Sequence, residues 1–261
     1  MGLCFNVLGS GSSGNSTLVS DGETHILIDA GLSCLQIERR LIEYGISPEK
    51  ISAIVVSHDH GDHCGGITTF VKKRDIPVFM TAEAFAASDI KVNPSKHRAI
   101  SPGECFEIGG VSVTSFSVPH DAVDPMGFVL EKNGVRIGVA MDLGFMSNLV
   151  IERLKGCAGI ILESNYDDDL LKLGPYPWAL KQRISSRSGH LSNKAVAEFL
   201  AGDFDGTAAH VVLAHLSRQN NNPDVALIKA REALGERSGL GRGQTKIELA
   251  YPNKISETYC Y

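Results

Sequence analysis

Short apolar runs rich in Val and Ile recur along the chain and are separated by Gly, Ser and Asp. Runs of this kind, bounded by turn residues, predict β-strands. We expect strands over residues 3–8, 17–19, 25–28, 51–56, 78–80, 105–108, 111–118, 128–131, 135–140, 159–162 and 211–214. Apolar positions with helical spacing instead predict a helix over residues 34–44, which Gly45 ends. Strands that alternate with helices indicate an α/β fold.

The second half of the chain repeats the order of the first. One strand ends in Asp29 and another in Asp142, and each Asp is followed by Gly two residues on. A helical stretch and then a buried strand follow in both halves, which indicates an internal duplication. Two such units packed sheet against sheet, with helices outside, would form a four-layer αββα sandwich. We expect a single domain over residues 1–261, with ligands at the edge where the strands end.

Composition and charge narrow the possible functions. The 261 residues, 43% of them hydrophobic, are enough for one sizeable core. The net charge of −5 does not favour attraction of the whole molecule to nucleic acid, so such an interface would be a local basic patch. No stretch approaches the roughly 20 apolar residues of a membrane span, and we expect no membrane partner. The six cysteines form no Cys-x-x-Cys pair, so we expect reduced thiols, mostly in the core, in a cytoplasmic protein.

The chemistry concentrates after the strand at residues 51–56, where three imidazoles and a carboxylate lie within residues 58–63. Three further donors each follow another apolar strand, so all of them can meet at one edge. The candidate ligands are His58, His60, Asp62, His63, His120, Asp142 and His215. A two-metal hydrolytic site needs about three side chains per ion and a bridging oxygen, so this set predicts two divalent ions, Zn or Mn. The other histidines are assigned to structure or surface: His25, His97 and His210.

With these residues the chain resembles the metallo-β-lactamase superfamily, whose signature H-x-H-x-D-H matches residues 58–63. The resemblance implies that one metal is held by His58, His60 and His120 and the other by Asp62, His63 and His215, with Asp142 between them. It also implies that Asp29 supports the metal loop from behind.

A closer resemblance is to the YycJ/WalJ branch, bacterial proteins regarded as exonucleases that act on double-stranded DNA from the 5′ end. It is carried by residues 9–16, 120–122, 163–165, 189–193 and 215–217. One departure is Tyr166, where the branch leads us to expect His. Tyr166 is not one of the expected ligands, so the metal site is unaffected.

Two dications would hold a bridging hydroxide as the nucleophile, and Asp62 or Asp142 would orient it or accept its proton. His190, between Gly189 and an expected helix start, is a candidate general acid for the leaving oxygen. Glu163 ends a buried strand and could orient His190. A helix-capping segment with an incidental His is the alternative.

A local basic patch lies over residues 170–194, which contain five basic residues and no acidic one. Aromatic residues lie among the cations, as in a nucleic-acid track, although a solvated helical face beside a core Trp is the alternative. The candidate contacts in the patch are Trp178, Lys181, Arg183, Arg187 and Lys194. Ser12, Ser13 and Asn15 lie in a Gly-rich loop that could cradle a phosphate or only shape one wall of the site.

The ligands and the patch favour a metal-dependent phosphodiesterase acting on nucleic acid, and the resemblance to the YycJ/WalJ branch implies a 5′→3′ exonuclease on double-stranded DNA. The alternatives are an RNA-processing nuclease of the tRNA 3′ type and a hydrolase of small esters, thioesters or lactones. The tRNA-type relatives extend a long arm, and no insertion of that size is evident here. DNA against RNA, strand polarity, the native metal and the oligomeric state stay open at this stage.

Overall fold

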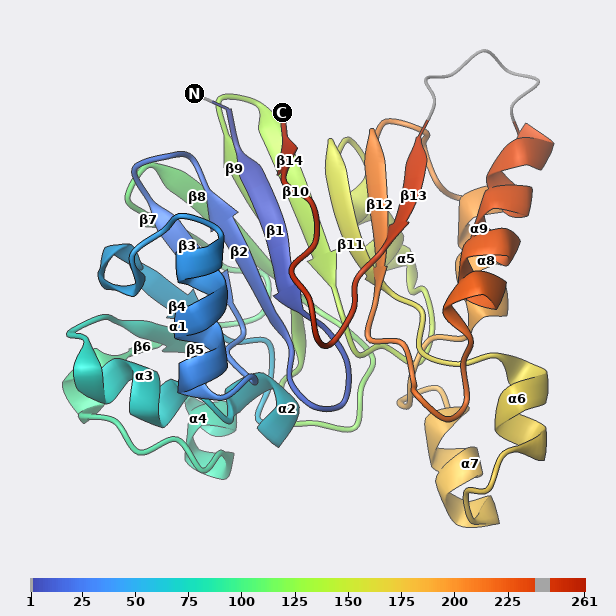
Figure 1. Cartoon of the computed structure of the whole chain (residues 1–261), viewed down its shortest axis with the longest axis horizontal. Helices are drawn as coiled ribbons and strands as arrows, with labels where there is room; N and C mark the ends of the chain where they lie inside the picture. Colours follow the sequence, from blue (N-terminus) through green and yellow to red (C-terminus); the bar gives the residue numbers. More distant parts are fainter. Residues whose placement is uncertain (1, 238–244) are drawn as a thin grey trace.

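The computed structural model describes residues 2–237 and 245–261, which form two seven-stranded sheets packed face to face (Figure 1). In order across the first sheet, the strands are β14 (Tyr259–Cys260), β1 (Cys4–Gly9), β2 (Ser16–Ser20), β3 (His25–Ile28), β4 (Ala53–Val55), β5 (Val78–Met80) and β6 (His97–Ala99). Across the second sheet they are β13 (Lys246–Leu249), β12 (His210–Ala214), β11 (Gly159–Glu163), β10 (Val135–Ala140), β9 (Met126–Lys132), β8 (Val111–Ser117) and β7 (Cys105–Ile108).

Helices cover the outer face of each sheet. The first sheet is covered by α1 (Cys34–Glu43), α3 (Ile67–Lys73) and α4 (Ala82–Ala87), and the second by α5 (Asn148–Leu154), α8 (Asn193–Ala201) and α9 (Pro223–Arg237). The shorter elements are α2 (Gly61–Cys64), α6 (Asp168–Leu173), α7 (Trp178–Ile184) and two 3₁₀ turns, Pro48–Lys50 and Pro94–Lys96. The four-layer αββα sandwich expected from the sequence is confirmed.

Continuous apolar runs form the strands because both faces of each sheet are buried. On β3, Ile26 and Ile28 point into the core between the sheets, whereas Leu27 packs under the helices outside. On β11, Ile161 points inward and Leu162 outward. Successive side chains of a strand alternate between faces, so one apolar run contributes to two cores.

The two halves have the same construction. In the first, β3 pairs antiparallel with β2 and, after α1, parallel with β4. In the second, β10 pairs antiparallel with β9 and, after α5, parallel with β11. Asp29 follows β3 and Asp142 follows β10. The duplication expected from the sequence therefore appears in the topology, with each Asp where the sheet changes from antiparallel to parallel pairing.

Three strands were not predicted, and each lies at an edge of its sheet: β6, β13 and β14. β6 reads His97-Arg98-Ala99 and β13 reads Lys246-Ile247-Glu248-Leu249, so neither carries the apolar run of a central strand. Edge strands of natural sheets commonly carry charged residues, which discourage pairing with other chains. The pattern that identifies buried strands therefore does not find these.

Four cysteines are free, in line with the expectation that most are reduced, but Cys4 and Cys260 form a disulfide between β1 and β14. Sequence spacing could not reveal this pair, because 256 positions separate the two residues and only the return of the chain beside β1 brings them together. Cys105 is also exposed rather than in the core. No helix in the two described segments is long and apolar enough to cross a bilayer.

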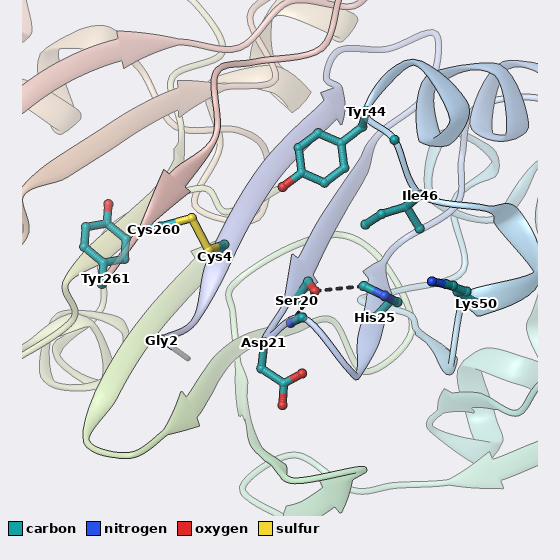
Figure 2. Close-up of a pocket in the computed structure, with 12 residues that line it drawn as sticks. Gly2, Cys4, Ser20, Asp21, His25, Tyr44, Ile46, Lys50, Cys260 and Tyr261 are labelled. Carbon is teal, nitrogen blue, oxygen red and sulfur yellow. Dashed lines mark hydrogen bonds between the residues drawn. A yellow bond between two sulfur atoms is a disulfide. The ribbon is translucent and has the colours of Figure 1, made fainter.

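The disulfide borders a pocket of about 660 Å³ at one end of the first sheet (Figure 2). His25 lines this pocket and its Nδ1 lies 2.8 Å from Ser20 Oγ. The other two histidines assigned to structure also have protein partners: His97 Nε2 donates to Met80 O at 2.9 Å, and His210 Nδ1 lies 2.9 Å from Tyr261 Oη. None of the three belongs to a donor cluster among the described residues.

Candidate metal centre

The candidate ligands come from loops at the ends of four strands. The loop after β4 carries residues 58–63, and its second half forms the short helix α2, which begins after His60. His120, Asp142 and His215 follow β8, β10 and β12. Asp142 and His215 have φ of 50° and 55°, a left-handed conformation that is uncommon for residues other than Gly. Such backbone concentrates at functional sites, where the surroundings hold it in place.

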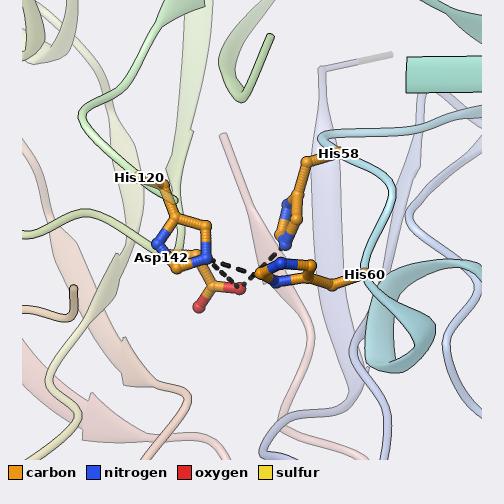
Figure 3. Close-up of side chains that lie close together, drawn as sticks. All are labelled: His58, His60, His120 and Asp142. Carbon is orange, nitrogen blue, oxygen red and sulfur yellow. Dashed lines mark hydrogen bonds and ion pairs between the residues drawn. The ribbon is translucent and has the colours of Figure 1, made fainter. Parts of the chain in front are cut away.

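One donor group contains His58, His60, His120 and Asp142, with ligand atoms within 4.8 Å of one another (Figure 3). Asp142 Oδ2 lies 3.3 Å from His58 Nε2 and 4.0 Å from His120 Nε2. The Nε2 of His120 lies 3.4 Å from Nδ1 of His60. Three imidazoles and one carboxylate therefore face a common point.

A second donor group contains Asp62, His63, His215 and again Asp142. His63 Nε2 lies 2.8 Å from Asp142 Oδ2, and His215 Nε2 lies 3.3 Å from Asp62 Oδ2. The two groups thus share the carboxylate of Asp142. Every candidate ligand is brought to the site, in the two sets that the resemblance implies.

The donor groups fit divalent cations. The Nε2 atoms of His58 and His215 and the Oδ1 of Asp142 are buried and have no hydrogen bond. Their charged neighbours are other members of the donor groups, such as Asp62 Oδ2 for His215 Nε2 and His215 Nδ1, at 2.5 Å, for Asp142 Oδ1. Buried polar atoms without hydrogen bonds are rare and costly, and nitrogen and oxygen donors are those that zinc prefers. The other ring nitrogen of His120 lies 2.9 Å from Gly189 O, and that of His58 lies 2.9 Å from Ser57 Oγ. Such contacts to one nitrogen leave the other for a metal.

The charges of the site are strongly coupled. Burial raises the pKa of Asp142, but the imidazoles of His215 and His63 outweigh it and hold that pKa well below its usual range. Burial lowers the pKa of His63 and His215, yet the Asp142 carboxylate raises both well above the ordinary value. Burial dominates at His58 and lowers its pKa. Asp142 is thus the negative centre that positively charged partners stabilise.

Asp29 lies behind the loop, where it was expected. It is buried, its Oδ1 accepts from Ser57 N at 2.8 Å, and its Oδ2 accepts from His63 Nδ1 at 2.7 Å. Ser57 Oγ also donates to Oδ2 at 2.9 Å. These bonds fix the ring of His63 with Nε2 toward the donor group.

The Gly-rich loop contacts the metal centre directly. Asn15, a candidate substrate contact, is buried, and its Nδ2 lies 3.1 Å from His63 Nε2 and 3.3 Å from Asp62 Oδ2. Ser10 Oγ accepts from the backbone N of His215 at 2.8 Å. Ser12 and Ser13 are exposed. The loop therefore braces the ligands on its inner side and presents two hydroxyls outward.

His190 and Glu163 meet as expected. Glu163 is fully buried at the end of β11, and its Oε1 lies 2.7 Å from His190 Nδ1 and 3.0 Å from His215 Nδ1. Burial lowers the pKa of His190, but the Glu163 and Asp142 carboxylates raise it to about 9. His190 Nδ1 lies 3.5 Å from Asp142 Oδ1. The pair adjoins the candidate ligands, and the raised pKa of His190 keeps a proton on its imidazole at neutral pH.

The basic patch occupies α6, α7 and the segment after them. Trp178 is 68% exposed, which excludes the alternative of a core Trp. Arg183 Nε donates to Asp121 Oδ2 at 2.5 Å, the guanidinium of Arg187 stacks 4.0 Å from the ring of Phe145, and Lys194 lies 3.8 Å from Glu198. The cations are therefore at the surface, but several already have partners.

Sequence reasoning missed Asn165 and Asp121. Asn165 Nδ2 donates to His215 O at 2.9 Å, which helps to hold that residue in its left-handed conformation. Asp121 holds Arg183 and lies 3.6 Å from His120 Nε2. Both stand inside motifs that carried the family resemblance, which is the only signal that could have found them.

Comparison with known proteins gives related sequences. Residues 24–216 match the family model described as a beta-lactamase superfamily domain. Exodeoxyribonuclease YycJ of Bacillus anthracis is 34% identical over 247 residues, which cover 94% of this chain and 93% of that protein. Exodeoxyribonuclease WalJ of Streptococcus pneumoniae is 32% identical over 231 residues, which cover 87% of this chain and 86% of that protein.

Solved structures share the fold at lower identity. The metallo-beta-lactamase fold protein YhfI of Bacillus subtilis gives a TM-score of 0.75 at 17% identity and covers 98% of this chain and 99% of its own. Zn²⁺-bound PqqB of Methylobacterium extorquens gives 0.70 at 18% identity and covers 97% and 99%. These two structures support the architecture and carry no conclusion on substrate.

Proposed function

This chain belongs to the metallo-β-lactamase superfamily, in its YycJ/WalJ-like branch, and we propose that it is a nuclease that uses two divalent metal ions, Zn or Mn. More narrowly, we propose an exonuclease that degrades double-stranded DNA from the 5′ end. The observation that carries the proposal is the buried pair of donor groups around Asp142, with His190 on Glu163 beside them. Relatives of this branch are named exodeoxyribonucleases, which favours DNA.

The two donor groups would each hold one cation, with Asp142 contributing to both. When bound, the cations supply Lewis-acid activation of a water nucleophile and offset the charge that develops on the phosphoryl group. Asp62, whose side chain is 24% exposed, is the ligand carboxylate open enough to orient that water or accept its proton.

His190 is the proposed general acid. Its Nδ1 faces Glu163, which leaves Nε2 to donate a proton to the leaving oxygen. Its side chain is 21% exposed, so a substrate can reach it. Because the carboxylates of Glu163 and Asp142 outweigh burial and raise the pKa of His190 to about 9, the ring carries that proton at neutral pH.

The backbone of the nucleic acid would lie along the outer hydroxyls of the Gly-rich loop and the basic patch. Exposed groups there are suited to phosphates. The proposed contacts are Ser12, Ser13, Lys181, Arg183, Arg187 and Lys194. Asn15 would act from inside, by holding Asp62 and His63.

The test is an assay of the purified protein in Zn and in Mn against 5′-labelled linear duplex DNA, single-stranded DNA, RNA and a thioester. We expect release of the 5′ label from duplex DNA, abolished by Asp62→Ala. Asp59→Asn is the matched control, since Asp59 lies in the same loop and accepts from Val123 N at 3.0 Å without joining a donor group. Full activity of Asp62→Ala would contradict the mechanism. Faster hydrolysis of RNA or of the thioester would refute duplex DNA as the substrate.

We also propose a cytoplasmic location, because the similar exodeoxyribonucleases come from bacteria, in which DNA, the proposed substrate, lies in the cytoplasm. Four cysteines are free thiols, in keeping with that compartment, while the Cys4–Cys260 disulfide is unusual for it. Fractionation of the native cells, followed by immunodetection, checks this, and recovery outside the cytoplasm would refute it.

A further inference from the structure

The hairpin made by α6 and α7 stands out from the sandwich beside the strand ends (Figure 1). It exposes large apolar side chains to solvent: Leu173 is 83% exposed and Trp178 is 68% exposed. Of the seven large hydrophobic residues exposed in the described segments, three fall between residues 170 and 178. An exposed apolar patch of this kind marks a binding surface.

One end of α7 is fixed to the metal centre. Arg183, in its last turn, donates to Asp121 beside His120. Ile184, the last residue of the helix, accepts from His190 N through its carbonyl at 2.9 Å, which ties the end of α7 to the proposed general acid. These two contacts fix the position of the hairpin relative to the metal centre.

Trp178 begins the same helix, five positions before Arg183. At roughly 1.5 Å per residue, the backbone of Trp178 lies about 7–8 Å beyond that of Arg183 along the axis. That length, about two nucleotides of a stacked strand at roughly 3.4 Å each, is measured from Arg183, which itself reaches the metal centre through Asp121. A strand with a phosphate at the metal centre would thus pass its neighbouring bases near the ring.

The charges around Trp178 also suit a nucleic-acid strand. The first turn of α6 carries Asp168 and Asp169, but residues 170–194, which include Trp178, carry no acidic side chain in a chain whose net charge is −5. Lys172 and Lys181 lie on the two helices, and Lys181 Nζ donates to Lys172 O at 2.7 Å, which braces the hairpin. Cations for phosphates beside an exposed ring for bases are the components of a single-strand binding surface.

We propose that Trp178 stacks on an unpaired base of the nucleic acid, on the strand whose phosphate lies at the metal centre. This inference rests on the proposed nuclease function and adds that the substrate strand is unpaired where it enters the site. Stacking on a ring is tolerant of sequence, so Trp178 selects for the presence of a base rather than for its identity.

Trp178 is the only Trp of the chain, so its fluorescence reports this contact directly. The zinc-loaded protein is titrated with a phosphorothioate oligonucleotide, which resists hydrolysis, and with the same oligonucleotide lacking bases near its 5′ end. We expect emission to change with the first, and the second to bind about 5–150-fold more weakly, as for one lost stacked base. Equal affinity, or binding with unchanged emission, would overturn the proposal.

Variants separate this inference from the nuclease proposal. For Trp178→Ala we expect kcat/KM on a labelled oligonucleotide to fall about 5–150-fold relative to kcat/KM on bis(p-nitrophenyl) phosphate, which has no nucleobase, measured on the same variant. Trp178→Phe should recover most of the loss. Leu35→Ala is the control, since Leu35 is 74% exposed on α1, away from the hairpin. If the ratio of the two kcat/KM values is unchanged in Trp178→Ala, the stacking proposal is refuted and the nuclease proposal is not. If the wild type hydrolyses neither substrate, the nuclease proposal is refuted.

Discussion

The Asp29→Asn substitution tests whether a buried hydrogen bond behind the site sets metal affinity. Asp29 accepts from His63 Nδ1 at 2.7 Å and from Ser57 N at 2.8 Å. Asn has the same shape and is one of the residues that best tolerate the φ of 59° at this position, so the backbone after β3 stays relaxed. It has one acceptor oxygen instead of two, however, and must turn an NH₂ group toward one of these donors.

The expected loss follows from that mismatch. Removing the hydrogen-bond partner of a ligating His typically lowers metal affinity about 10–100-fold, or roughly 1.4–2.7 kcal/mol. The cation at the His63 group should be lost first, because Asp29 contacts His63 directly and reaches His58 only through Ser57 Oγ. Zinc content should therefore fall from two ions per chain toward one as a chelator is added.

The assay is a chelator competition followed by elemental analysis of zinc. Asp21→Asn is the matched control, since Asp21 is also buried and also accepts three hydrogen bonds, from Glu23 N, Thr24 N and Lys132 Nζ. It lies at the pocket in Figure 2, outside the donor groups. Wild-type zinc affinity in Asp29→Asn, or an equal loss in Asp21→Asn, would refute the reasoning.

Three further predictions concern proton transfer, charge and covalent stability. His190→Ala should lower kcat about 10²–10⁴-fold, as expected for a lost general acid, with zinc content unchanged; loss of zinc would instead make His190 a ligand. Because the pKa of His63 and His215 is raised above 6.5 in the fold, the stability that their charged forms contribute is complete below 6.5 and is lost as pH rises through the raised values. The thermal midpoint of the metal-free protein should therefore fall as pH rises above 6.5 while that of the zinc-loaded protein does not, and a parallel fall in both would contradict this. Reducing the Cys4–Cys260 disulfide should lower the unfolding free energy by about 2–5 kcal/mol without changing zinc content, and an unchanged denaturant midpoint would show that the bond is absent in solution.

The positions of the ligands could be predicted from the sequence because each follows an apolar strand. His120, Asp142 and His215 were placed at one edge on that ground alone, and the structure brings them together. Which partners each would meet came only from the family resemblance, because side chains that meet across two sheets have no fixed spacing in the sequence. The same limit hid the ion pair that joins Arg183 to Asp121, so a cation that reads as free along the chain is paired in the fold.

The two duplicated aspartates show what decides whether a strand-end carboxylate binds a metal. Asp29 and Asp142 end equivalent strands, both are buried, and both have positive φ. Each oxygen of Asp29 accepts a hydrogen bond from Ser57 or His63, so its lone pairs are used within the protein. Asp142 Oδ2 faces the ring nitrogens of His58, His63 and His120, and Oδ1 lies 2.5 Å from Nδ1 of His215, so this carboxylate meets rings of both donor groups. The same residue on the same scaffold therefore becomes a brace where backbone and hydroxyl groups of the metal loop surround it, and a candidate ligand where imidazoles of both donor groups surround it.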